Sequence, residues 1–101
     1  MKKLEELKKI ISEHKQGLEQ KYKVKRIAIF GSYARNQQKE ESDVDILVEF
    51  NEPVGLIHLV SLENYLSDIL GIKTDVIPRE DIRKELKDVI LKEAIPVWKE
   101  V

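Results

Sequence analysis

Apolar residues recur along this chain with two alternating periods, which predict a succession of helices and strands. From residue 2 to residue 20 they are spaced three, four and seven apart, as on one amphipathic helix. The next apolar segment, Val24–Phe30, is rich in β-branched residues and apolar on both faces, as in a buried central strand. Gly31-Ser32 ends that strand, and Ser32 is a suitable N-cap for a short helix over residues 33–38.

A second strand is predicted over Asp43–Phe50 because its residues alternate between two kinds of side chain. One face carries Val44, Ile46, Val48 and Phe50, and the other carries Asp43, Asp45, Leu47 and Glu49. The first face is suited to a core. The second brings two carboxylates to the same side of the strand.

The rest of the chain continues this alternation. It predicts a helix over residues 56–70, a strand over 72–77, a helix over 79–93 and an extended segment over 94–101. Gly71 and Pro78 end the first two of these elements, and Pro96 restricts the last segment to a sheet edge. The order predicts an α/β (α+β) fold, in which a small mixed sheet of three to four strands is flanked by helices. We expect residues 1–101 to form a single domain.

Composition narrows the possible classes of protein. The chain has 101 residues, of which 42% are hydrophobic and 37% charged, and it has no cysteine. Disulfides and thiolate metal sites are therefore excluded. No apolar run approaches the roughly 20 residues of a membrane span, and the charged start lacks the apolar centre of a signal peptide. We expect a soluble cytoplasmic protein with no membrane partner.

The charge distribution argues against a nucleic-acid-binding protein. The net charge is -1, although residues 1–30 hold nine Lys or Arg against four Glu. These basic residues alternate with Glu at helical spacing, which is typical of a solvated helix face. Direct nucleic-acid binding is not expected.

Two short motifs carry candidate chemistry. Gly31-Ser32, at a junction between strand and helix, would expose backbone N–H groups beside a hydroxyl, which suits a phosphate, although Gly-Ser is also common at helix caps. Asp43 and Asp45 lie about 7 Å apart on one strand face and would repel each other unless a cation lies between them. The pair alone fits equally well the solvent-facing start of a strand.

A third acid favours the functional interpretation. Asp75 lies in the middle of the strand predicted over residues 72–77, where Asp is disfavoured without a partner. If that strand lies beside the strand of Asp43 and Asp45, the three carboxylates can face one another. Three such acids can hold two Mg²⁺ ions roughly 3.5–4 Å apart. With Gly-Ser holding a triphosphate, the predicted chemistry is nucleotidyl transfer.

These residues carry a family resemblance. Gly31-Ser32-Tyr33-Ala34-Arg35, followed by Ser42-Asp43-Val44-Asp45-Ile46-Leu47-Val48, resembles the signature of the polymerase-β-like nucleotidyltransferases. The chain is most similar to the minimal nucleotidyltransferases (MNT proteins), and the likeness extends over nearly its whole length.

The resemblance implies a role for each matching residue. Asp43 and Asp45 would be catalytic metal ligands, and Asp75 would be the third acid, a metal ligand and the base or the group that orients it. Gly31 and Ser32 would bind the β- and γ-phosphates of ATP.

Two further positions are less defined. Arg35 would reach a phosphate, but a cationic surface residue is nearly as good an interpretation. Asn36 stands where the family usually has Gly. We interpret it as a tolerated substitute, because Asn adopts a positive φ more readily than most residues.

The resemblance also implies a biological role, that of the antitoxin in a HEPN–MNT toxin–antitoxin pair. The predicted function is Mg²⁺-dependent transfer of AMP from ATP to a tyrosine of a partner HEPN toxin, with which the chain would form a hetero-oligomer. Two alternatives stay open. The chain could neutralise the toxin by masking it without catalysis, or it could modify a small-molecule acceptor such as an aminoglycoside.

Overall fold

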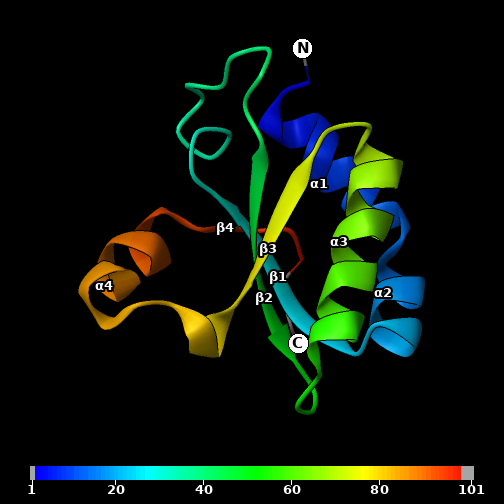
Figure 1. Ribbon diagram of the computed structural model, residues 1–101. Helices are drawn as coiled ribbons and strands as arrows, with labels where there is room; N and C mark the ends of the chain where they lie inside the picture. The colour runs from blue at the N-terminus through cyan, green and yellow to red at the C-terminus, as the bar shows by residue number, and fades with distance from the viewer. Residues whose placement is uncertain (1, 99–101) are drawn as a thin grey trace.

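A four-stranded mixed sheet, covered by three helices on one face, is the centre of the computed structural model, which describes residues 2–98 (Figure 1). The strand order is β3-β2-β1-β4. β1 (Val24–Phe30) is antiparallel to β2 (Val44–Phe50) and to β4 (Ile95–Pro96), whereas β2 and β3 (Thr74–Pro78) are parallel. The predicted α+β fold is confirmed, and Pro96 lies in an edge strand as expected.

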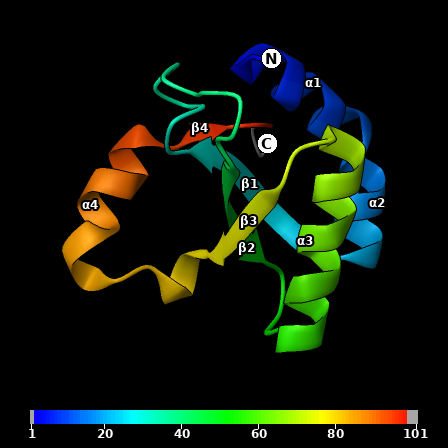
Figure 2. The same ribbon diagram turned by 45° about the horizontal axis from the view of Figure 1, so that its top comes forward.

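Three helices pack on the same face of this sheet: α1 (Leu4–Glu13), α2 (Lys15–Lys21) and α3 (Leu56–Leu70) (Figures 1 and 2). The core lies between them and the inward-facing side chains of the strands. Its fully buried residues include Leu7, Ile11, Leu18, Ile29, Ile46, Leu62, Leu66 and Leu70. The periodicity of the sequence predicts this face correctly.

The opposite face of the sheet is only partly covered. The 3-10 helix η1 (Arg79–Asp81) and α4 (Lys84–Glu93) follow β3, and α4 lies apart from the other helices (Figure 2). No residue of α4 is buried. The expectation that β1 is buried on both faces therefore holds in part, because on this face Phe30 is buried, Ala28 is half-buried and Arg26 is exposed. We call this second side the open face.

The helix predicted over residues 2–20 is broken at His14. The ring Nδ1–H of His14 donates to the Ile10 carbonyl over 2.9 Å, and its backbone N–H donates to the Ile11 carbonyl over 3.0 Å. The side chain thus takes the carbonyl that the backbone would use in a continuous helix. The apolar spacing continues across the break, so periodicity alone predicts one helix.

The short helix predicted over residues 33–38 is wrong, since residues 31–36 form turns. Asn36 has a φ of 58°, as expected for its position. The Asn36 N–H donates to the Tyr33 carbonyl over 3.3 Å, and the Gln37 N–H donates to the Ser32 carbonyl over 2.8 Å. These are the two hydrogen bonds of a Schellman motif, which ends a helix. The segment stops after a single turn because its end signal comes immediately after its start.

Other element bounds differ by a few residues. β2 begins at Val44 and β3 at Thr74, one and two residues later than predicted. The helix predicted over 79–93 is divided into η1 and α4. Of the extended segment predicted over 94–101, Ile95–Pro96 pairs with β1, and residues 99–101 lie outside the described residues. Within residues 2–98 no helix has the length and apolar character needed to cross a membrane.

The packing predicts a sharp contrast between two apolar positions of α3. Leu66 is fully buried, whereas Ile57 is 87% exposed. Leu66→Ala should lower the free energy of unfolding by about 2–5 kcal/mol through lost burial and a residual cavity. Ile57→Ala, the matched control, should change it by less than about 0.5 kcal/mol. Urea unfolding followed by circular dichroism measures both, and equal effects would contradict this core.

Candidate functional site

Two of the predicted acids are direct neighbours on the open face. Asp45 of β2 pairs in register with Asp75 of β3. The Val44 N–H donates to the Lys73 carbonyl over 2.9 Å, so the segments that precede β2 and β3 also lie side by side. Asp43, two residues before Asp45, therefore lies at the same end of the sheet, with its Oδ2 3.8 Å from Lys73 Nζ. The three acids thus lie at the same end of the sheet, with Asp45 and Asp75 in register.

Side chains of α3 hold the strand that carries Asp75. β3 is an edge strand, so half of its backbone N–H groups have no neighbouring strand. The Thr74 N–H donates to Ser67 Oγ over 3.0 Å, and the Val76 N–H donates to Glu63 Oε2 over 2.8 Å. These two bonds lie on either side of Asp75 and fix its strand to the helix.

The end of β1 brings Gly31 against the same acids. Phe30, the last residue of β1, pairs with Asp45, and Gly31 follows with a φ of +77°. A Cβ atom on Gly31 would overlap the Asp45 carboxylate and would lie 3.1 Å from its Cγ. Any side chain here would be both strained and in collision. Glycine is therefore required at this contact.

The hydrogen-bond donors of the turn that begins at Gly31 already have partners within the chain. The Gly31 N–H donates to Glu93 Oε1 over 2.5 Å, and Arg35 Nη1 donates to the same oxygen over 2.8 Å. Arg35 Nε also donates to Gln37 over 3.1 Å. Ser32 is half-buried in this turn. The three predicted phosphate-binding residues thus lie in one turn, which we call the cradle (residues 31–35).

Glu93, the last residue of α4, is the site residue that the sequence analysis missed. It is 62 residues from Gly31 along the chain. One signal was available: an acid in the last turn of a helix meets the negative end of the helix dipole. Such a residue needs a compensating partner elsewhere, which here is the cradle.

Negative charge accumulates around Asp45. Its pKa is raised above the usual value, first by burial and then by the charges of Asp75 and Asp43, while Arg35 acts in the opposite direction. Burial and the charge of Asp43 also raise the pKa of Tyr33. Among the charges that act on Asp45, three acids (Asp75, Asp43 and Glu93) raise its pKa and one cation (Arg35) lowers it.

The donor set fits a divalent cation. Carboxylate oxygens are preferred ligands of Mg²⁺, and a cation would relieve the repulsion at Asp45. Within residues 2–98, however, no three His, Cys, Asp or Glu side chains converge closely enough in this arrangement to enclose an ion. Asp43, Asp45 and Asp75 would have to turn toward a shared ion.

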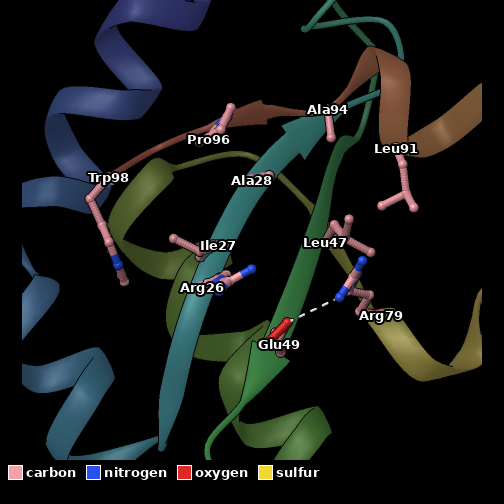
Figure 3. Close-up of a pocket in the computed structure, with 10 residues that line it drawn as sticks. All are labelled: Arg26, Ile27, Ala28, Leu47, Glu49, Arg79, Leu91, Ala94, Pro96 and Trp98. Atoms are coloured by element: carbon pink, nitrogen blue, oxygen red, sulfur yellow. Dashed lines mark hydrogen bonds and ion pairs between the residues drawn. The ribbon is translucent and has the colours of Figure 1, made fainter. Parts of the chain in front are cut away.

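A cavity of about 490 Å³ lies on the open face, and none of the three acids lines it. Leu47, two residues after Asp45, and Ala28 line it from the sheet (Figure 3). Leu91 lines it from the α4 side and points toward Leu47 (Figure 3). Arg79 Nη1 donates to Glu49 over 3.4 Å at one end. The volume of the cavity is large enough for an organic group.

Sequence comparisons agree with this geometry. A family model described as "Nucleotidyltransferase domain" matches residues 11–97. The chain is 60% identical over 82 residues to "Putative protein adenylyltransferase MJ1217" of Methanocaldococcus jannaschii, covering 81% of this chain and 84% of that protein. It is 38% identical over 94 residues to Protein adenylyltransferase MntA of Thermococcus cleftensis, covering 93% of this chain and 95% of that protein.

Solved structures show the same fold. A toxin–antitoxin structure with AMP-PNP has a TM-score of 0.76 at 22% identity, covering 92% of this chain and 73% of that chain. A tri-AMPylated Shewanella oneidensis HEPN toxin in complex with MNT antitoxin gives a TM-score of 0.67 at 19% identity, with the same two coverages. At these identities the likeness is one of fold.

The raised pKa of Asp45 predicts a pH-dependent cost to the metal-free protein. The folded state binds this proton more tightly than the unfolded state, so the ionised carboxylate destabilises the fold above the raised pKa. In EDTA at pH 7, Asp45→Asn should raise the free energy of unfolding by roughly 0.5–1 kcal/mol. The gain should shrink as the pH falls through the raised pKa and vanish below the ordinary carboxyl range.

Urea unfolding between pH 3 and 8 measures this effect. Asp88→Asn, an exposed change of the same type on α4, is the control and should show no such profile. A destabilising Asp45→Asn at pH 7 would contradict the interpretation.

Proposed function

Since the chain belongs to the nucleotidyltransferase domain family, we propose that it transfers AMP from ATP to a tyrosine of a partner HEPN toxin and so acts as an antitoxin. The resemblance to the minimal nucleotidyltransferases is confirmed by these matches, and the enzyme class follows from the family. The donor, the ion, the acceptor and the partner are proposals. So are a single domain over residues 1–101 and a cytoplasmic location, where ATP is available.

One observation carries the proposal: Asp45 lies between Gly31 and Asp75. Gly31, directly after β1, lies so close to the Asp45 carboxylate that a Cβ atom would overlap it, and Asp75 pairs with Asp45 from β3. A triphosphate bound at the cradle would therefore have its phosphates beside three carboxylates. In nucleotidyl transfer, the groups that bind the phosphates and the ligands of the cation must lie next to each other.

The chain's own residues have distinct tasks in this reaction. The Gly31 N–H, the Ser32 hydroxyl and the Arg35 guanidinium would bind the β- and γ-phosphates of ATP. Asp43, Asp45 and Asp75 would hold Mg²⁺, with two ions proposed. When bound, Mg²⁺ supplies charge neutralisation on the phosphates and lowers the pKa of the attacking hydroxyl.

The transfer step would be an in-line displacement at the α-phosphorus. The tyrosine oxygen forms a bond to the α-phosphorus, the bond from the α-phosphorus to the bridging oxygen breaks, and pyrophosphate leaves. Asp75 would accept or orient the proton of the tyrosine hydroxyl, since it is the acid farthest from the cradle in strand order. The cradle would retain the negative charge that develops on pyrophosphate.

A macromolecular acceptor is supported by the arrangement of the site. The acids lie on the open face, where α4 has no buried residue. A tyrosine on a partner protein can approach such a site. The similarity to protein adenylyltransferases, and to a toxin–antitoxin complex with a HEPN toxin, favours that partner and a hetero-oligomer.

The direct test is incubation with labelled ATP, Mg²⁺ and the cognate toxin, followed by intact mass. We expect mass increments of AMP on the toxin. Asp43→Asn combined with Asp45→Asn should lower the transfer rate by at least about 100-fold, because the cation loses two charged ligands. Asp88→Asn should retain full activity as the matched control. Undiminished transfer by the double variant would contradict the assignment of these acids.

Asp75→Asn distinguishes a catalytic antitoxin from one that neutralises the toxin only by masking it. The variant should still bind ATP and the toxin but transfer AMP at least about 100-fold more slowly, because the proton of the acceptor hydroxyl has no base. In cells it should fail to neutralise the toxin at native expression. Full protection by Asp75→Asn, with no AMP detectable on the toxin, would favour a masking antitoxin.

A further inference from the structure

We propose that Glu93 is a displaceable occupant of the cradle, so that a nucleotide must expel this carboxylate, and the end of α4 with it, in order to bind. The inference rests on the proposed function, because it assumes that the cradle binds phosphates. It adds a carboxylate that competes with the nucleotide from within the same chain.

The contacts of Glu93 are those of a bound anion. Its Oε1 accepts from the Gly31 N–H over 2.5 Å and from Arg35 Nη1 over 2.8 Å. Its side chain is only 19% exposed. A carboxylate oxygen and a phosphate oxygen are both anionic acceptors, and they satisfy the same backbone and guanidinium donors. One Gly31 N–H cannot serve both groups fully.

Glu93 is also poorly placed with respect to the acids. Its charge adds to the repulsion that Asp45 receives from Asp43 and Asp75. A triphosphate brings its own cations to these acids, whereas Glu93 brings none. The carboxylate is therefore a weaker occupant than a nucleotide with Mg²⁺, and can be displaced by it.

The helix that carries Glu93 is loosely packed. α4 has no buried residue, and its Leu86 and Val89 are 48% and 59% exposed. Leu91 of α4 and the sheet residues Ala28 and Leu47 line the cavity of about 490 Å³ between them (Figure 3). An element with so little burial opens at low free-energy cost. Withdrawal of Glu93 from the cradle would therefore expose no buried residue of α4.

Two other roles for Glu93 predict effects of the opposite sign. If Glu93 only holds Gly31 and Arg35 in position for the nucleotide, its removal should weaken binding. If it is a ligand of Mg²⁺, its removal should weaken binding only when Mg²⁺ is present. A displaceable occupant alone predicts tighter binding with and without the ion.

The experiment is calorimetric titration of AMP-PNP into the wild-type chain, Glu93→Gln and Glu93→Ala, each with Mg²⁺ and in EDTA. Glu85→Gln removes the same charge from the exposed start of α4 and is the matched control. Both Glu93 variants should bind AMP-PNP about tenfold more tightly than the wild-type chain. In these variants no carboxylate has to leave the cradle, so the binding-competent state is fully populated. Glu85→Gln should match the wild-type chain. Thermal unfolding should show that every variant is folded.

A second measurement follows α4 itself. Amide NMR signals of residues 84–92 should shift when AMP-PNP is added to the wild-type chain, and Glu93→Ala alone should move them in the same direction. Equal or weaker binding by both Glu93 variants would overturn the inference while leaving the proposed function intact. Absence of binding by every protein would overturn the proposed function and this inference with it.

Discussion

The contact between Gly31 and the Asp45 carboxylate is the constraint on which the site depends. Because β1 pairs with β2 up to Phe30 and Asp45, the first residue beyond β1 has to pass directly over the acid. Only a residue without a side chain fits there, and only glycine adopts its φ of +77° without strain. The same step therefore ends the strand, turns the chain and delivers a backbone N–H to the acids. The proposed phosphate-binding N–H and the proposed cation ligands are adjacent as a direct consequence of strand pairing.

The one-sided packing of the sheet explains why this contact is accessible. The three helices α1, α2 and α3 supply the core from one face, and side chains of α3 also satisfy the free N–H groups of the edge strand β3. Stability is thus provided on the side away from the acids. The open face can then carry groups that do not stabilise the fold, such as Asp45 and Asp75, and it also carries a cavity.

Local signals in the sequence predicted the elements that have local causes. The bounds of β1 and α3 follow from apolar periodicity and from Gly31 and Gly71, which end them. The break at His14 depends on a ring hydrogen bond that no periodicity reports. The register of Asp45 with Asp75 was a conditional hypothesis, since the pairing of two parallel strands is not encoded in either strand alone. The contact of Glu93 with Gly31 spans 62 residues and was missed for the same reason.

The balance of charges at the site favours a catalytic origin over a purely structural one. Four carboxylates surround the end of the sheet, and the ion pairs with Lys73 and Arg35 engage only Asp43 and Glu93. Asp45 and Asp75 face each other in register, and burial adds to the cost at Asp45. A fold selected for stability or for covering a partner would replace one of these acids, because an amide of the same shape removes the repulsion. Carboxylates that repel one another without a cation would gain free energy when a cation binds between them. The proposed nucleotide and its cation would thus account for the acids, and the proposed phosphate site for the position of Glu93.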